Sequence, residues 1–395
     1  MRIRGEGKIT WSPSKNLYRC TIDLGYRPDG TRNRIELTSK DKNALIDKRR
    51  ARIRQIEDGT YTPGKVPTLT AWWGHWCDVI ARDRVNPRVL DNYRSYGRRH
   101  IPHIGKRRLD KLTVDDVRHL HKMMRDGGAS DRTVQAVHNT LSKSLKDAVR
   151  EGIIPRNVCD RMDRPPATSR EGESYSLAEV RALVTTAAGD GPRWESMWRT
   201  AIMMGPRQAE RLGMEWDRLD LDRGLADVSW QVQRIPWAHG HECDCPEGVG
   251  AARCPHRRPD APSRMEIRPC HAGVWFTRPK TAASKRLTPI PRPVLTSLRE
   301  WRAQSTGRGL VWTNHGRPIN PRDDSAAWKE LCARADVRTL RTHSARHTMV
   351  STLLDAGVDP EVIRQIAGHS TILSTRDYMH VSTEQARRAL EVWDF

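Results

Sequence analysis

The sequence lacks the features that place a protein in or across a membrane. Its 395 residues contain no apolar run long enough to span a bilayer, and the N-terminus, Met1–Arg4, lacks the apolar core of a signal peptide. Phenylalanine is nearly absent, with two residues, but 37% of the residues are hydrophobic, including fourteen tryptophans, which is enough to build cores. We expect a soluble cytoplasmic protein, and a chain of this length predicts two to four domains.

Acidic residues are scarce relative to basic ones. The chain has 48 Asp and Glu against 69 Lys and Arg, which gives a formal net charge of +21. Such a surplus indicates a polyanionic partner, and nucleic acid fits far better than a membrane surface. Ribosomal and RNA-binding proteins share this property, so charge alone does not define the class.

The first sixty residues have the pattern of a small sheet followed by a basic helix. Lys8–Trp11, Leu17–Leu24 and Arg32–Leu37 are β-prone segments, and Asp29-Gly30 marks a turn before the third. A helix is predicted from about Lys40 to Ile56. Its arginines are either a solvated face or contacts to DNA, and we predict DNA contact through Arg49, Arg50 and Arg52.

From residue 66 to residue 165 the pattern is helical. Trp72, Trp73 and Trp76 recur at helical spacing, as a core face would, and predict packing, not a base-stacking platform. Thr113 to Asp116 resembles a capping box, and Ser130 or Asp131 starts a further helix. Turn-rich stretches at 59–65 and 164–170 predict linkers, so we expect domains at 1–60, 66–165 and 174–395.

Near the end of the chain two short helices joined by a turn are predicted. The first carries an apolar run and stops at Gly357, a residue suited to a left-handed C-terminal cap. Asp359-Pro360 supplies an N-cap and a preset first turn for the second helix, which Gly368 ends.

Four side chains around these helices could converge on one anion. His343 and Arg346 share a face at the positive end of the first helix, His369 follows the second helix, and Tyr378 lies nine residues further on. Each also has an ordinary explanation: a solvated helix face, a helix stop, or a half-buried tyrosine. Together they indicate a phosphate-binding site.

These motifs, in this order, resemble the active-site boxes of tyrosine recombinases of the phage-integrase type. His343–His347, then Ala367–His369, then Tyr378 resemble the family's H-x-x-R-H, L-G-H and nucleophilic tyrosine, with Ala367 in place of leucine. Tyr378 is also the only tyrosine after Tyr175.

Two earlier segments complete the resemblance. Gly205–Leu212, followed by Trp216 and Leu219–Leu221, resembles the family's first box, with Pro206 where leucine is usual. The segment Pro279–Arg286 resembles P-K-T-x-x-S-x-R and is expected within a β-hairpin that spans residues 275–290. The matched positions are Arg207, its acidic companion Glu210, and Lys280, with Lys285 as the alternative lysine.

The resemblance implies that a tyrosine attacks a DNA phosphodiester, leaving a 3′-phosphotyrosyl linkage and a free 5′-hydroxyl. Because the linkage keeps the bond energy, a hydroxyl of a second duplex can reverse the step without ATP or metal. Arg207 and Arg346 would offer always-charged donors to the non-bridging oxygens. Tyr378, with a free pKa of about 10, needs a base, for which His343 is best placed. The other assignments are Lys280 as the acid for the leaving 5′-hydroxyl, His369 as a further hydrogen-bond donor, and Glu210 as a support behind these groups.

The resemblance also implies a fold and partners. The fold is multidomain α+β: an arm-type DNA-binding domain with a three-stranded sheet and a helix, a helical core-binding (SAM-like) domain, and a mainly α catalytic domain with a small antiparallel sheet. The partners are double-stranded attachment sites in a bacterial host's nucleoid, other copies in a homotetramer on DNA, a host DNA-bending protein and an excision factor. The expected phosphate contacts in the helical domain are Arg94, Arg98, Arg99, Lys106 and Arg107.

Cysteine usage points to a metal site. Eight cysteines in an intracellular chain of this size do not suggest a disulfide framework, yet four lie within residues 243–270. This Cys/His-rich insertion at about 239–271 is either a loop with reduced thiols or a structural zinc site. The predicted zinc ligands are Cys243, Cys245, Cys254 and His256, with Cys270 as substitute.

Several functions share parts of this pattern. An integrase that inserts or excises a phage or mobile element fits best, because resolution recombinases usually lack the front module. A type IB topoisomerase would relax DNA without pairing two sites, and a non-catalytic DNA-binding regulator would not need the intact set of catalytic-type residues.

Overall fold

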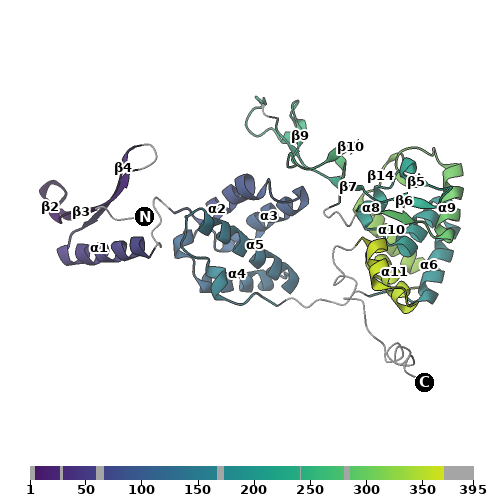
Figure 1. Ribbon diagram of the computed structural model, residues 1–395, viewed down its shortest axis with the longest axis horizontal. Helices are drawn as coiled ribbons and strands as arrows, with labels where there is room; N and C mark the ends of the chain where they lie inside the picture. Colours follow the sequence, from purple (N-terminus) through teal and green to yellow (C-terminus); the bar gives the residue numbers. More distant parts are fainter. Residues whose placement is uncertain are drawn as a thin grey trace, which may run out of the picture. The chain divides into compact units, whose positions relative to one another are not determined.

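The computed structural model describes residues 5–26, 30–58, 66–166, 173–240, 242–279 and 285–368. The chain divides into two compact units, Met1–Thr168 and Ser169–Phe395 (Figure 1). In the described ranges no helix combines the length and apolar character needed to cross a bilayer. Lys280, His369 and Tyr378 lie outside these ranges.

The first unit begins with the predicted sheet and helix. The elements are β1 (Gly5–Glu6), β2 (Thr10–Ser12), β3 (Leu17–Tyr26), β4 (Arg32–Ser39) and α1 (Lys42–Glu57). β1 and β2 both pair antiparallel with β3, and β4 pairs along its other edge, so the sheet has three strand positions, as predicted. Asp41 caps α1 by accepting a hydrogen bond from the Ala44 amide at 2.6 Å. The small core consists of Cys20, Ile22, Leu45 and Ile56.

The rest of the first unit is helical. Its helices are α2 (Leu69–His75), continued by a π-helical turn (Trp76–Ala81), α3 (Pro87–Arg99), α4 (Val114–Asp126) and α5 (Asp131–Arg150). The predicted capping box opens α4, with the Thr113 amide donating to Asp116 at 2.9 Å and the Asp116 amide to Thr113 at 3.2 Å. The tryptophans are core residues, as predicted: Trp72 and Trp76 are buried and donate their indole N–H groups to α5.

The second unit carries seven α-helices in its described residues. They are α6 (Leu177–Gly189), α7 (Pro192–Arg199), α8 (Gln208–Leu212), α9 (Arg292–Gln304), α10 (Pro321–Arg334), α11 (Ser344–Asp355) and α12 (Pro360–Ala367). Tryptophan takes the place of phenylalanine in the core: Trp198 packs on Trp328 at 5.1 Å between ring centroids, and Trp216 and Trp312 are fully buried. The indole N–H groups of Trp312 and Trp328 both reach buried oxygens, which makes these bulky side chains tolerable in a dry core.

Small antiparallel sheets accompany these helices. The strands are β5 (Leu219–Asp220), β6 (Leu225–Asp227), β7 (Gln231–Arg234), β8 (Trp237–Ala238), β9 (Arg258–Pro259), β10 (Ile267–His271), β11 (Val274–Thr277), β12 (Leu287–Pro289), β13 (Thr313–Asn314) and β14 (Arg317–Pro318). Their pairing orders are β12-β6-β5, β10-β11-β7, β8-β9 and β13-β14.

The predicted hairpin over residues 275–290 is wrong. β11 pairs with β7 and β12 pairs with β6, so the two segments do not pair with each other. β6 and β7 follow one another along the chain, and both pairings are antiparallel. β11 and β12 belong to two different three-stranded sheets, β10-β11-β7 and β12-β6-β5. Just before β12, the Val228 amide donates to the Arg286 carbonyl at 2.8 Å.

The final helix pair matches the prediction. α11 and α12 pack through Met349, Val350, Ile363 and Ala367. Gly357 and Gly368 have φ of 76° and 68°, the left-handed conformation expected after each helix. Asp359 caps α12 by accepting from the Glu361 amide at 2.7 Å.

Candidate active site

The site is built around a tight passage from α7 into α8. Gly205 has a φ of 59° and lies so close to α11 that a Cβ would meet the Met349 side chain at 2.6 Å. Arg207 follows as the N-cap of α8. Its amide donates to Glu210 Oε2 at 3.0 Å, and its Nη1 donates to Oε1 at 2.7 Å. The proline at position 206 therefore leaves Arg207 fixed against a carboxylate.

Glu210 holds two guanidinium groups. Its side chain is fully buried, and Arg286 Nη2 donates to Oε2 at 3.2 Å. Burial raises the pKa of Glu210, but the charges of Arg286 and Arg207 outweigh that effect and hold the pKa below its usual range. The carboxylate is therefore ionised at neutral pH and fixes both arginines. Arg286 is the last position of the motif at Pro279–Arg286, but no role for it was predicted from the sequence.

Three arginines meet the end of α12. Arg286 Nε donates to the Ile366 carbonyl at 2.8 Å, Arg346 Nη2 to Ala367 at 2.6 Å, and Arg207 Nη2 to Gly368 at 3.2 Å. The last carbonyls of a helix lack intrahelical partners and carry its negative dipole end, so cations suit them. The arginines thereby fix the backbone that leads directly into position 369.

Arg346 also ties the first box to the final helices. Its Nη1 donates to the Gly205 carbonyl at 2.8 Å, and only 2% of the residue is exposed. The Arg207 side chain, by contrast, is 38% exposed. Three guanidinium groups against one carboxylate leave a surplus of positive charge with one arginine open to solvent. This arrangement can bind an anion of phosphate size.

His343 stands one residue before α11, beside this cluster. Burial first, and then the charges of His347, Arg346 and Arg207, lower the pKa of His343 to about 4. Its ring meets that of His347 edge-on at 4.9 Å between centroids. The imidazole is therefore neutral at pH 7 and able to accept a proton. His347, whose pKa is also lowered by burial, was not singled out from the sequence.

Comparison with known proteins gives a consistent family. The Phage integrase family model matches residues 266–385. An integrase of Saccharopolyspora erythraea is 26% identical and the alignment covers 91% of this chain and 90% of that protein. The ICEBs1 integrase of Bacillus subtilis is 22% identical, covering 95% and 96%. The chain carries a phage integrase family domain and is similar to integrases and tyrosine recombinases over nearly its whole length.

Solved structures show the same fold. The Tn1549 transposon integrase in complex with transposon right end DNA matches this chain with a TM-score of 0.65 at 18% identity, over 83% of this chain and all of that one. A lambda integrase dimer bound to a COC′ core site matches with a TM-score of 0.55 at 14% identity, over 97% and 98%. These matches confirm the predicted multidomain α+β fold.

The predicted catalytic positions divide into two groups. Arg207, Glu210, His343 and Arg346 come together as described above. Lys280, His369 and Tyr378 lie outside the described residues, and their roles stay predictions. The alternative lysine, Lys285, is exposed immediately before Arg286.

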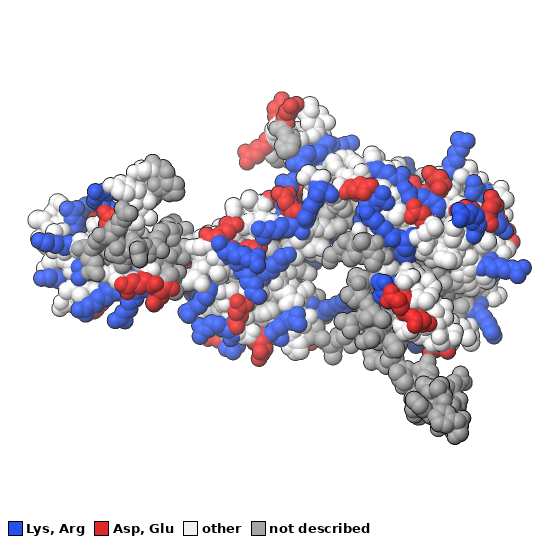
Figure 2. Space-filling view, in the orientation of Figure 1, with Lys and Arg blue, Asp and Glu red and all other residues white. Residues whose placement is uncertain are grey.

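The predicted DNA contacts lie on helices and turns of the first unit, where Figure 2 shows many basic side chains on the viewed face of residues 66–166. Arg50, Arg98, Arg99, Lys106 and Arg107 are exposed, whereas Arg49, Arg52 and Arg94 are half-buried. Arg94 pairs with Asp78 and Arg107 with Asp116, at 2.9 and 3.0 Å. Ion pairs this close to solvent add little stability, and the contacts of these residues with DNA stay predictions.

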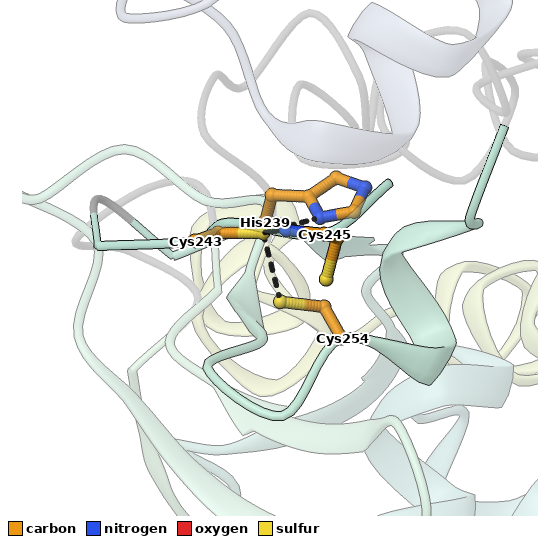
Figure 3. Close-up of side chains that lie close together, drawn as sticks. All are labelled: His239, Cys243, Cys245 and Cys254. Atoms are coloured by element: carbon orange, nitrogen blue, oxygen red, sulfur yellow. Dashed lines mark hydrogen bonds between the residues drawn. The ribbon is translucent and has the colours of Figure 1, made fainter. Parts of the chain in front are cut away.

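The cysteine prediction needs one correction. Cys243, Cys245 and Cys254 do meet, but the fourth member is His239 instead of His256 (Figure 3). The chain turns after Cys254, with the Arg257 amide donating to the Cys254 carbonyl at 3.2 Å, and leaves the His256 side chain exposed. His239 was noticed in the sequence as part of the cluster but not chosen as a ligand. Cys270 lies on β10, outside this group.

The depressed pKa of His343 gives a test of its environment. A histidine whose folded pKa lies near 4, below its unfolded value of about 6.5, adds stability above pH 6.5 and loses it as the pH falls toward 4. We expect the urea midpoint of the wild type to fall across this window and that of His343→Gln to fall less. His121, His138 and His347 also have lowered pKa values, so a residual slope remains in the variant. Identical slopes in the two proteins would contradict the assignment.

Proposed function

We propose that this tyrosine recombinase integrates or excises a phage or other mobile element by site-specific recombination through a 3′-phosphotyrosyl intermediate. The observation that carries the proposal is the group of Arg207, Arg286 and Arg346, beside a neutral histidine: the first two pair with the buried Glu210 carboxylate, and all three bind the carbonyls at the end of α12. Segments far apart in the sequence build this group, and its surplus charge suits a phosphodiester.

The geometry supports a defined division of labour. Arg207, through its exposed guanidinium, would contact a non-bridging oxygen and stabilise the charge that grows as phosphorus becomes pentavalent. Arg346 would act from the deeper position, where its bonds to the Gly205 and Ala367 carbonyls hold its positive charge beside Arg207. Glu210 and Arg286 keep these groups in place before DNA arrives, so little reorganisation is needed during the reaction.

The proposed reaction balances without a further reactant. The Tyr378 oxygen bonds to phosphorus, its proton passes to His343, and the bond from phosphorus to the 5′-oxygen breaks. Lys280 protonates that oxygen, which leaves a 5′-hydroxyl. Rejoining is the reverse step with a 5′-hydroxyl from a second duplex, and the phosphodiester count is unchanged.

The assembly proposed is a tetramer on two paired attachment sites. A lambda integrase tetramer bound to a Holliday junction matches this chain with a TM-score of 0.54 over 92% of it. Two duplexes that exchange strands need four cleavages, and one nucleophile per copy requires four copies.

A suicide substrate tests the proposal. A duplex from the element's own junction, nicked so that the 5′-hydroxyl fragment diffuses away, should trap a protein–DNA adduct that resists denaturant and is removed by protease. Two junction duplexes should then yield exchanged strands. Relaxation of plasmid without strand exchange would favour a topoisomerase, and DNA binding with no adduct would favour a regulator.

A deletion tests the role of the first module. If residues 1–60 bind separate arm sites, their removal should leave cleavage of a core-site suicide substrate nearly unchanged and reduce complete integration by roughly tenfold or more, because loss of a second binding site removes avidity. A full chain with Arg50→Glu and Arg52→Glu on α1 is the milder companion variant. Integration by the deleted protein at the wild-type rate would refute the arm-binding role.

A further inference from the structure

We propose that His239, Cys243, Cys245 and Cys254 hold one structural zinc ion. Their four ligand atoms all lie within 4.8 Å of one another. Cys243 Sγ lies 3.1 Å from His239 Nδ1 and 3.4 Å from Cys254 Sγ (Figure 3). Tetrahedral zinc, with bonds of about 2.3 Å to sulfur and 2.0 Å to nitrogen, sets its ligands about 3.5–3.8 Å apart. The group therefore already has nearly the size of a filled site.

The donor set selects the metal. Three thiolates and one imidazole are soft to borderline ligands, which suit zinc and exclude calcium or magnesium. Four protein ligands close the coordination sphere and leave no position for substrate or water. The ion would therefore have a structural role, and the proposed DNA chemistry would not run through it.

The surrounding backbone fits a metal-binding turn. The Cys245 amide donates to Cys243 Sγ at 3.4 Å, a contact that stabilises a thiolate. Arg258 Nε donates to the His239 carbonyl at 3.3 Å and so holds the histidine's backbone. Gly240 lies so close to the turn after Cys254 that a Cβ would meet the His256 carbonyl oxygen at 2.1 Å. A glycine there lets the two ligand-bearing segments approach one another.

The segment has almost no core of its own. Among its described residues, 239–240 and 242–257, Cys254 alone is buried, and the flanking strands β8 and β9 pair over two residues each. So little apolar burial cannot offset the conformational entropy of ordering such a loop. Metal binding contributes directly to folding in segments of this kind.

The zinc-ordered segment reaches the proposed active site through β11. Trp237 of β8 packs edge-on against Trp275 of β11 at 5.6 Å between centroids, and the Arg257 guanidinium lies over the Trp237 ring, 4.8 Å from its centroid. The Ile235 amide also donates to the Gly273 carbonyl at 3.1 Å. β11 leads within three residues of its end to Lys280. Loss of the ion should therefore loosen β11, the strand that precedes this lysine in the chain.

Metal content of the full-length protein tests the site. Protein purified without chelator should contain about one zinc per chain by elemental analysis. His239→Gln, and Cys243→Ser combined with Cys254→Ser, should lose it. His256→Gln, two residues from Cys254 but outside the cluster, should keep it and is the matched control. A zinc-free wild type, or zinc lost from His256→Gln and kept by His239→Gln, would overturn the assignment.

Cobalt substitution covers the case in which the variants fail to fold. Wild-type protein exchanged with Co²⁺ should show the visible bands of tetrahedral cobalt and the near-ultraviolet charge transfer of thiolate ligands. A disulfide between Cys243 and Cys254, or octahedral cobalt spectra, would refute the site. Slower cleavage by the zinc-free variants, with the adduct still formed, rests in addition on the proposed function. Metal content and spectra do not, so failure of one proposal can be told from failure of the other.

Discussion

Tyr378→Phe is expected to remove all covalent attachment to DNA while leaving the affinity for duplex attachment sites nearly unchanged. The substitution deletes the one oxygen that can bond to phosphorus and keeps the aromatic ring. DNA affinity comes mainly from lysines and arginines that contact phosphates, and these are untouched. Adduct on a denaturing gel and mobility shifts at one fixed salt concentration measure the two quantities separately.

Tyr175→Phe is the matched control, because Tyr175 is the nearest preceding tyrosine in the chain. Its hydroxyl is buried and accepts a hydrogen bond from the Leu340 amide at 3.1 Å. Removing this group should cost about 1 kcal/mol of stability and leave the adduct intact. If the adduct persists in Tyr378→Phe, or vanishes in a folded Tyr175→Phe, the assignment of Tyr378 as the nucleophile is wrong.

Local signals in the sequence were enough to predict most elements of the fold. The caps at Thr113, Ser176 and Asp359 and the glycines at 357 and 368 each satisfy helix-end groups through neighbours a few residues away. Such interactions depend on short spacing, so the sequence displays them. The three-strand pattern of the first module is equally local.

The pairing of strands that lie far apart in the chain was harder to predict from the sequence. β11 and β12 look like the arms of one hairpin because a turn-like segment separates them. Instead, β11 pairs with β7 and β12 pairs with β6, strands that precede them by some fifty residues. Nothing in the segment itself shows which earlier strand it will join. The choice depends on β6 and β7, which belong to two different sheets and each offer an edge to a later strand.

In the candidate site, too, local motifs were predicted from the sequence and long-range contacts were not. Arg207, His343 and Arg346 were found because the resemblance carries them, but the role of Arg286 depends on a carboxylate 76 residues away. His239 replaces His256 for a related reason: a ligand two residues from Cys254 looks favourable in the sequence, but the turn there directs the chain away. The spacing of Cys and His residues indicates that a metal site is present, whereas the direction of the backbone determines which of these residues meet.

Glu210→Gln should disable the proposed site from within. The glutamine has nearly the same shape but carries no charge, and its amide group would set N–H donors against the guanidinium donors of Arg207 and Arg286. Arg286, whose side chain is 7% exposed, would lose its ion-pair partner while close to another cation. Leaving one member of a buried pair unmatched costs about 3 kcal/mol or more. In a unit of this size that corresponds to a fall in Tm of about 6–12 °C.

Glu179→Gln is the control for this change, because both glutamates stand at the third position of a capped helix in the same unit and each pairs with arginine. Glu179 pairs with Arg338, whose side chain is 54% exposed, so its loss should cost about 1 kcal/mol. Calorimetry and single-turnover cleavage should show Glu210→Gln losing far more stability and rate than Glu179→Gln, with DNA affinity similar in both. If the two variants instead behave alike, Glu210 does not organise the arginines. The phosphate-binding group would then have to be held by the carbonyls of residues 366–368 alone.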